Sequence, residues 1–301
     1  MITMSEYQYY EFRTIDRPLN QRQMDELRKW STRAEITPTS FTNVYHYGDF
    51  RGSPETMMER YFDAFVYVAN WGTNRLMFRI PRRLLDVKAA GEYAAEDVLS
   101  IKAKRKHVVL EFLSNEEGGD WVEGEPWMAQ LIGLRAELMR GDLRALYLGW
   151  LSSLRERYGY DDEDREEGAD VFEPPVPPGL GKLSAPLKAL AEFLRVEEEL
   201  LEVAAKPSGG DVPSEPSREA LERWIKKLPA AEKNQYLLRF LAEDGDIRLR
   251  SELRQRYAEA TLPKQARPAP IPRRTAAQVL AACDARIEAK KRRKTQRAAR
   301  K

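Results

Sequence analysis

The chain has 301 residues, and its 50 lysines and arginines against 48 acids leave a net charge of +2. A single cysteine and two histidines exclude a disulfide framework and a cysteine-rich metal site. No apolar run approaches the roughly 18 residues that a membrane span needs, and the N-terminus lacks the basic and apolar regions of a secretory signal, so we expect a cytoplasmic protein without membrane contact.

The first 47 residues carry strand and helix signals in turn. Residues 6–15 are aromatic and β-branched, which predicts a strand. Asn20 followed by Gln23 has the spacing of a capping box and predicts a helix over residues 21–33. Residues 36–47 predict a second strand.

The next stretch begins with a strong helix start. Ser53–Pro54 supplies a capping hydroxyl and a proline at the first helical position, and apolar residues at helical spacing extend the predicted helix to Gly72. Residues 75–80, 98–104 and 107–114 predict further strands. The sequence therefore predicts an α+β fold, with a mixed sheet and packed helices in the N-terminal part.

From Pro126 onward the apolar residues recur at helical spacing, and this period predicts an all-α region. Gly141 and Asp142 have the residue types that end one helix and cap the next. The predicted segments are an aromatic-rich α+β domain with a helical hairpin (1–158, hairpin 126–158), an acidic and proline-rich linker (159–183), a short helical pair (184–206), a linker (207–216), a helical segment (217–260), a proline-rich hinge (261–274) and a basic helical tail (275–301).

The near-zero net charge is the sum of oppositely charged segments. Residues 264–301 hold 13 cations and two acids and sum to +11, whereas residues 159–173 hold eight acids and one arginine and sum to −7. Runs of like charge resist folding and are typical of linkers and tails. On the last helix, the apolar positions end at Ile287, so we expect its first half to dock and its second half to stay exposed.

The basic tail is the strongest functional signal. Its predicted polyanion-binding residues are Lys290, Lys291, Arg292, Arg293, Lys294, Arg297 and Arg300. Such a cluster binds polyanions by counterion release without reading a base sequence, and its lack of aromatic residues disfavours base stacking. Three interpretations stay open: the tail contacts nucleic acid or an acidic protein partner, it folds onto the acidic residues 161–173, or it is simply solvated.

One place in the N-terminal domain could assemble a catalytic site. His46 and Asp49 follow the second predicted strand, and Glu11 and Arg13 lie on the first, so a general base could meet an orienting carboxylate there. An inert histidine at a strand end is the alternative. No nucleophile elbow, phosphate loop or EF-hand spacing occurs, and we expect no metal and no cofactor.

A third hypothesis concerns the tyrosines. Tyr7, Tyr9, Tyr45 and Tyr47 could line a groove for a small ligand or a peptide, although core packing is the commoner use of aromatic side chains. The sequence therefore favours a non-enzymatic interaction or adaptor protein, with an enzyme around His46 and a ligand-binding module as alternatives.

Three runs of residues resemble a family of bacterial proteins of uncharacterised function. They are residues 7–12 with 15–19 (YQYYEF, IDRPL), 33–41 (RAEITPTSF) and 141–150 (GDLRALYLGW). The resemblance covers residues 5–205 and implies a cytoplasmic bacterial protein. It implies no activity, cofactor or catalytic residue.

Overall fold

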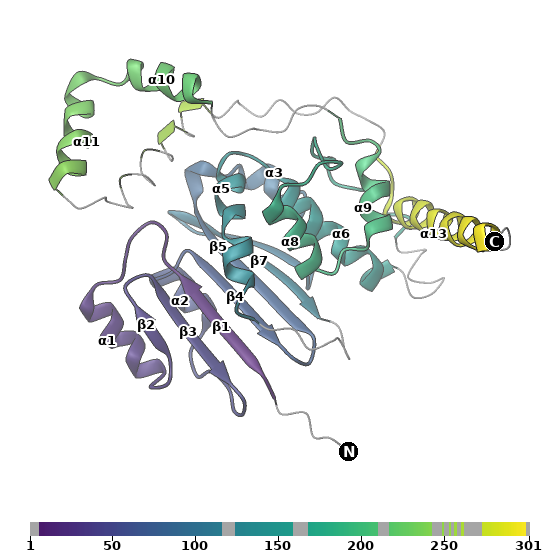
Figure 1. The fold of residues 1–301 in the computed structure, drawn as a ribbon, viewed down its shortest axis with the longest axis horizontal. Helices are drawn as coiled ribbons and strands as arrows, with labels where there is room; N and C mark the ends of the chain where they lie inside the picture. The colour runs from purple at the N-terminus through teal and green to yellow at the C-terminus, as the bar shows by residue number, and fades with distance from the viewer. Residues whose placement is uncertain are drawn as a thin grey trace.

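The structure is a computed structural model, and it describes residues 6–115, 124–158, 168–209, 217–242 and 273–298, with isolated positions between 249 and 261. The α+β expectation is confirmed. An antiparallel sheet occupies the N-terminal part, and the helices and strands that the structure describes after it are all helices (Figure 1).

The sheet has seven strands in the order β2-β3-β1-β4-β5-β7-β6. They are β1 (Gln8–Arg13), β2 (Glu35–Thr37), β3 (Ser40–Tyr45), β4 (Ala64–Ala69), β5 (Thr73–Pro81), β6 (Leu99–Ala103) and β7 (His107–Asn115). Every pairing is antiparallel, so the prediction of a mixed sheet is wrong. Three of the six pairings, β2–β3, β4–β5 and β6–β7, follow from connectivity, because each pair is joined by a short turn and short turns join antiparallel strands.

The helices lie between these strands in sequence and after them. They are α1 (Gln21–Trp30), α2 (Pro54–Arg60), α3 (Val87–Gly91), α4 (Trp127–Leu131), α5 (Gly133–Met139), α6 (Arg144–Tyr158), α8 (Ala185–Phe193), α9 (Glu198–Ala205), α10 (Arg218–Lys227), α11 (Ala230–Ala242) and α13 (Ala276–Ala298), with a 3-10 turn at Arg82–Leu84.

The predicted helix starts are confirmed in atomic detail. The Asn20 side chain accepts a hydrogen bond from the Gln23 backbone N–H, and the Gln23 side chain accepts one from the Asn20 N–H, which completes the capping box of α1. Ser53 caps α2 with Pro54 at its first position. Gly141 has φ +83°, the left-handed conformation that ends a helix without strain, and Asp142 accepts from the Arg144 N–H at 3.1 Å.

The predicted helix from Ser53 to Gly72 is wrong in its second half. The helix α2 ends at Arg60, and residues 64–69 form β4, a central strand. The helix prediction failed here because residues 64–69 (AFVYVA) are nearly all apolar, and such a run fits a helical period as well as a strand period. A strand buried on both faces shows such a continuous apolar run, and β4 is covered by α2 on one face and by α4 on the other.

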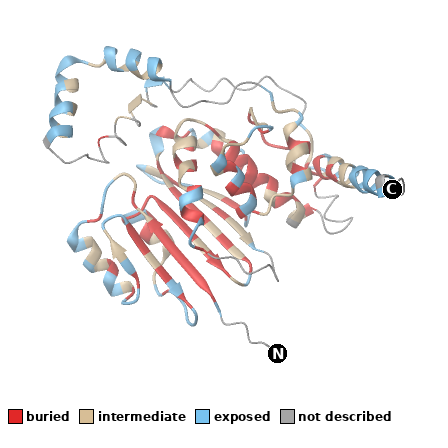
Figure 2. Cartoon of the chain, viewed as in Figure 1, coloured by how far each residue is buried: buried red, intermediate tan, exposed pale blue. Residues whose placement is uncertain are grey.

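The two faces of the sheet bury separate cores. On one face, side chains such as Leu76 and Phe112 pack under α4, α5, α6 and α8. On the other face, Phe12 and Phe65 stack with ring centroids 4.2 Å apart, in a core completed by α1, α2 and the turn at Phe50. Figure 2 shows the buried residues concentrated in the sheet and in the helices packed against it.

The first of these cores continues to the C-terminal helix. Phe193 of α8, Val203 of α9, and Val279 and Cys283 of α13 are all completely buried within it. Residues 168–173 also return alongside the start of α13, through a bridge between Phe172 and Thr275. The last helix is therefore a component of the main body.

The helices α10 and α11 have a different character. No residue of α10 is buried, and α11 exposes Leu237, Leu238, Phe240 and Leu241 by more than half of their surface. Beyond residue 242, the predicted helical segment (217–260) has only isolated positions among the described residues, and one of them, Tyr257, contacts Trp224 of α10. None of the helices that the structure describes has both the length and the apolar composition to span a membrane.

Candidate functional site

The four residues predicted to form a catalytic site are divided between different surroundings. Glu11 and Arg13 form an ion pair of 2.6 Å and alternate with Tyr10 and Phe12, so they point to the opposite face of β1. Asp49 accepts a hydrogen bond from the Gln8 side chain at 3.3 Å, and Gln8 shares the face of Tyr10, to whose hydroxyl it is bonded. These three residues thus lie on two sides of the sheet.

His46 is exposed, and its ring lies 6.0 Å from that of Tyr7. No carboxylate among the described residues forms a hydrogen bond or ion pair with it. Glu11, in contrast, is almost fully buried and accepts hydrogen bonds from Arg13 and, at 2.9 Å, from the Tyr9 hydroxyl. Burial and the Glu11 charge raise the pKa of Tyr9 well above its ordinary value. Glu11 is therefore satisfied by Arg13 and Tyr9, and no hydrogen bond among the described residues joins it to His46.

The four tyrosines proposed to line a groove do not share one. Tyr7, Tyr9 and Tyr45 are buried, and Tyr9 and Tyr45 pack on opposite faces of the sheet, since Tyr9 alternates with Tyr10, against which the Tyr45 ring packs. Tyr47 is exposed and lies under the guanidinium of Arg33.

The C-terminal helix brings together most of the other functional candidates. Its start is fixed by a capping box, since the Gln278 N–H donates to the Thr275 hydroxyl and the Thr275 N–H donates to the Gln278 side chain. Its apolar face, with Val279, Leu280 and Cys283 buried, packs on α9 and α6. The predicted docking of the first half is confirmed.

Ion pairs reinforce this docked half. Arg274 donates to both oxygens of the buried Glu173, at 2.6 and 2.8 Å, and Arg155 of α6 joins Asp284 and Glu197 at 2.9 Å each. Two-point guanidinium–carboxylate pairs fix orientation as well as attraction. They hold the base of α13 rigidly on the body.

The next cations along the helix are also neutralised within the protein. Arg286 pairs with Glu202, and Lys290 pairs with Glu199 at 2.8 Å and with Glu202 at 3.4 Å. The hydrogen bond from Lys290 lowers the pKa of Glu199. Of the predicted polyanion-binding residues, Lys290 thus has an internal partner, and that partner belongs to α9.

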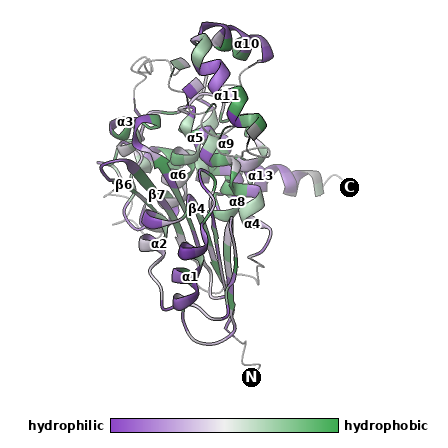
Figure 3. Cartoon of the chain, turned by 90° about the vertical axis from the view of Figure 1, so that its left-hand side faces the viewer, coloured by the Kyte–Doolittle hydropathy of each residue, from purple (hydrophilic) through white to green (hydrophobic). Residues whose placement is uncertain are grey.

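Beyond Lys290 the helix is exposed at every position whose burial is described. Lys291 reaches Glu288 of its own helix at 3.2 Å, whereas Arg292, Arg293 and Lys294 have no ion-pair partner among the described residues. The side chain of Arg297 and all of Arg300 lie outside the described residues, as do acidic residues 161–167. Figures 1 and 3 show α13 projecting from the body toward the C-terminus.

This outer segment, residues 291–294, carries charge in all directions. Successive helical residues are rotated by about 100°, so four consecutive cations surround the helix axis. Glu288 is the nearest acid in sequence, and no acid follows it. The outer half of α13 is therefore a cationic rod, about 12 Å long over residues 291–298 at 1.5 Å per residue.

The lone cysteine is part of the docking surface. Cys283 is fully buried, and burial, with the nearby charge of Glu197, raises the pKa of its thiol to about 11. Thiolate is the nucleophilic form of cysteine, so this side chain serves as a packed apolar group. The described residues contain no cluster of three or more His, Cys, Asp or Glu side chains arranged to hold a metal ion.

Comparisons with protein families, with curated proteins and with solved structures found no match to this chain.

Proposed function

We propose that this protein is a non-enzymatic interaction protein whose C-terminal helix binds polyanions, nucleic acid in particular. The observation that carries the proposal is the division of α13 into two halves. The inner cations, Arg286 and Lys290, are matched by acids of α9, whereas Arg292, Arg293 and Lys294 have no such match among the described residues.

A rigidly anchored cationic helix suits a nucleic acid groove for a geometric reason. A helix with its side chains is about 10–12 Å across, close to the width of the major groove of B-DNA, about 12 Å. Phosphates border that groove on both sides, and cations placed around the whole helix would face both strands. A flat acidic surface would meet only one side of such a helix.

The outer half also has the composition of a binder that does not read base sequence. Residues 291–298 contain no aromatic side chain. Besides the cations, only Thr295 and Gln296 could form hydrogen bonds with a base edge, and Thr295 already donates its hydroxyl proton to the Lys291 carbonyl. Affinity would therefore come mainly from counterion release.

The test compares a triple variant of the outer half with a charge-matched control. In the first, Arg292, Arg293 and Lys294 are replaced by Gln; in the second, the exposed cations Arg22, Lys29 and Lys88 on α1 and α3 are replaced by Gln. Binding of a fluorescent 20-base-pair duplex of arbitrary sequence is followed by anisotropy over a salt series. The outer triple should lower the salt-dependence slope by about 2.7, and the control triple should leave it unchanged.

Equal slopes for the outer triple and the wild type would contradict the proposal. A parallel titration with poly-glutamate separates the two classes of polyanion. If poly-glutamate bound as tightly as the duplex at equal salt, an acidic protein would be the better partner. The variant Lys290→Gln provides an internal control, because that cation is already paired and should contribute little to binding.

A further inference from the structure

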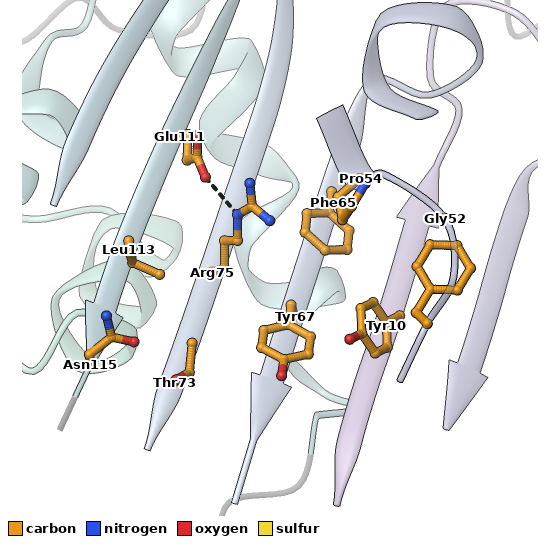
Figure 4. A pocket seen from close by; sticks show the side chains of 11 residues that line it. Tyr10, Gly52, Pro54, Phe65, Tyr67, Thr73, Arg75, Glu111, Leu113 and Asn115 are labelled. Atoms are coloured by element: carbon orange, nitrogen blue, oxygen red, sulfur yellow. Dashed lines mark hydrogen bonds and ion pairs between the residues drawn. The ribbon is translucent and has the colours of Figure 1, made fainter. Parts of the chain in front are cut away.

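The sheet face opposite the helical layer holds an open pocket of about 550 Å³. It spans four strands, with Tyr10 and Tyr67 at one end and the polar residues Arg75, Glu111 and Asn115 at the other (Figure 4). Phe50 also lines the pocket, and its ring lies 5.3 Å from that of Tyr10. The pocket is distinct from α13 and from His46, and nothing in the proposed polyanion binding uses it.

The register of the strands builds the floor of this pocket. Tyr10 is paired with Tyr67, Tyr67 with Arg75, and Arg75 with Leu113. Directly paired residues of antiparallel strands share a face, so these four side chains form one continuous row from β1 to β7. The helix α2 packs on β4 and β5 next to this row, and its first residue, Pro54, lines one side of the pocket.

The charge of Arg75 is already offset. Its Nε donates to Glu111 at 2.6 Å, and its Nη2 donates to Glu55. The Glu55 carboxyl is partly buried, which raises its pKa, but hydrogen bonds from Arg75 and Ser53 outweigh burial and lower the pKa to about 2. An anionic ligand at Arg75 would thus meet two carboxylates that are in contact with the same guanidinium.

The remaining polar groups mostly accept hydrogen bonds. The Tyr10 and Tyr67 hydroxyls both donate to the Gln8 side-chain oxygen, at 2.7 and 3.1 Å, so their own oxygens are left as acceptors. Gln8 in turn donates to Asp49. On the far side, Lys102 approaches Glu111 at 3.4 Å from a half-exposed position. The lining itself is neutral, because its one cation, Arg75, pairs with its one acid, Glu111. Beside the tyrosine end, Asp49 has no ion-pair partner among the described residues and contacts the pocket through Gln8.

We propose that this pocket binds a ligand that carries an ammonium or guanidinium group on an apolar or planar body. The cation would be attracted to Asp49 and to the tyrosine oxygens, since both oxygens of Glu111 are already engaged by Arg75, Ser100 and Lys102, and ring faces attract cations as well. The body of the ligand would cover Tyr67 and Leu113. A free amine and a basic side chain of a peptide share this chemistry, and the experiment distinguishes them.

The test uses three probes that share a phenyl ring and differ in charge: phenethylamine, phenylpropanol and phenylpropionate. A blocked Gly-Arg-Gly peptide represents the peptide source. Binding to the full-length protein is measured by calorimetry and by NMR saturation transfer. We expect phenethylamine or the peptide to bind about tenfold or more tightly than the neutral and anionic probes, and the tighter of the two identifies the source.

Variants at one position provide a matched pair. Leu113→Lys should weaken binding of the cationic probe and Leu113→Glu should strengthen it, while Glu96→Gln, at an exposed position paired with Arg157, should change nothing. Thermal unfolding checks that each variant is folded. The inference is overturned if the neutral or anionic probe binds as tightly as the cations, if the two Leu113 variants behave alike, or if no cationic probe binds at millimolar concentration.

Discussion

Glu173 and Arg274 form a two-point ion pair between residues 101 positions apart in sequence. Glu173 is almost completely buried, and it also accepts a hydrogen bond from the buried Tyr147 hydroxyl of α6. The pair therefore joins three separate segments: α6, the end of the acidic run and the residue that precedes the capping box of α13. It is the point at which the C-terminal helix closes on the body.

Replacement of Glu173 by Gln should destabilise this closure. The variant leaves a quarter-exposed Arg274 without its anion, and breaking a buried pair by removing one partner costs about 3 kcal/mol or somewhat less at such exposure. Urea unfolding followed by circular dichroism measures the loss. Glu222→Gln, which breaks the exposed pair with Arg218, should change stability by less than about 0.5 kcal/mol; equal effects of the two variants would contradict the expectation.

The second prediction concerns acid stability. Asp63 is buried, which raises its pKa, but Arg135, Arg79 and the backbone N–H groups of Ile15 and Asp16 outweigh burial and lower the pKa below its usual 3.8. Stability from the ionised carboxylate is thus present above pH 3.8 and lost as the pH falls through the folded pKa.

The variant Asp63→Asn tests this linkage. Near neutral pH it should be less stable than the wild type by about 3 kcal/mol, and the two unfolding free energies should converge as the pH drops below the folded pKa. Asp25→Asn, at an exposed position of α1, is the control. A stability difference that stays constant down to the acid limit would show that the Asp63 charge is not responsible.

Tyrosine ionisation gives a third prediction. Burial, together with the nearby charge of Asp49, raises the pKa of Tyr10 to about 12. A raised phenol pKa contributes stability that is complete below the ordinary pKa of about 10 and is lost as the pH rises toward 12. An absorbance titration of phenolate should show one fewer late-ionising group in Tyr10→Phe than in the wild type; an unchanged number of late-ionising groups would contradict the expectation.

A fourth prediction concerns the approach of α6 to the sheet. A Cβ at Gly149 would lie 3.0 Å from the Phe112 ring and 3.1 Å from Leu99, and both neighbours are buried. Alanine improves helix propensity by about 1 kcal/mol, but overpacking typically costs about 1–3 kcal/mol. Gly149→Ala should therefore be destabilising overall, by about 1 kcal/mol, in thermal unfolding. A stabilised variant would mean that the helix shifts without cost.

Local signals in the sequence predicted local structure well. The capping box of Asn20 and Gln23, the Ser53–Pro54 start and the strands predicted over 98–104 and 107–114 each depend on residues close in sequence. The strand β4 was missed because its burial depends on α2 and α4, which cover its two faces, and its pairing depends on β1 and β5. Periodicity reveals none of these contacts.

The same difference between local signals and long-range contacts separates the two candidate sites. The exposed outer half of α13 follows from its composition and was predicted. The sheet pocket was missed because Tyr10, Tyr67, Arg75 and Leu113 become neighbours only through the register of four strands. A signal was present, since Arg75, Met77 and Arg79 alternate with Leu76, Phe78 and Ile80, which marks one face of that strand as partly polar.

The closure by Arg274 also has a consequence for the order of synthesis. A ribosome makes Glu173 about a hundred residues before it makes the cation that neutralises it, and the surfaces of α6 and α9 that α13 covers are made earlier as well. During this interval the nascent protein carries an unmatched acid beside uncovered apolar side chains, a state prone to misassociation. A chain that stops short of residue 274 would remain in that state permanently, so loss of the C-terminus should cause misfolding of the whole body.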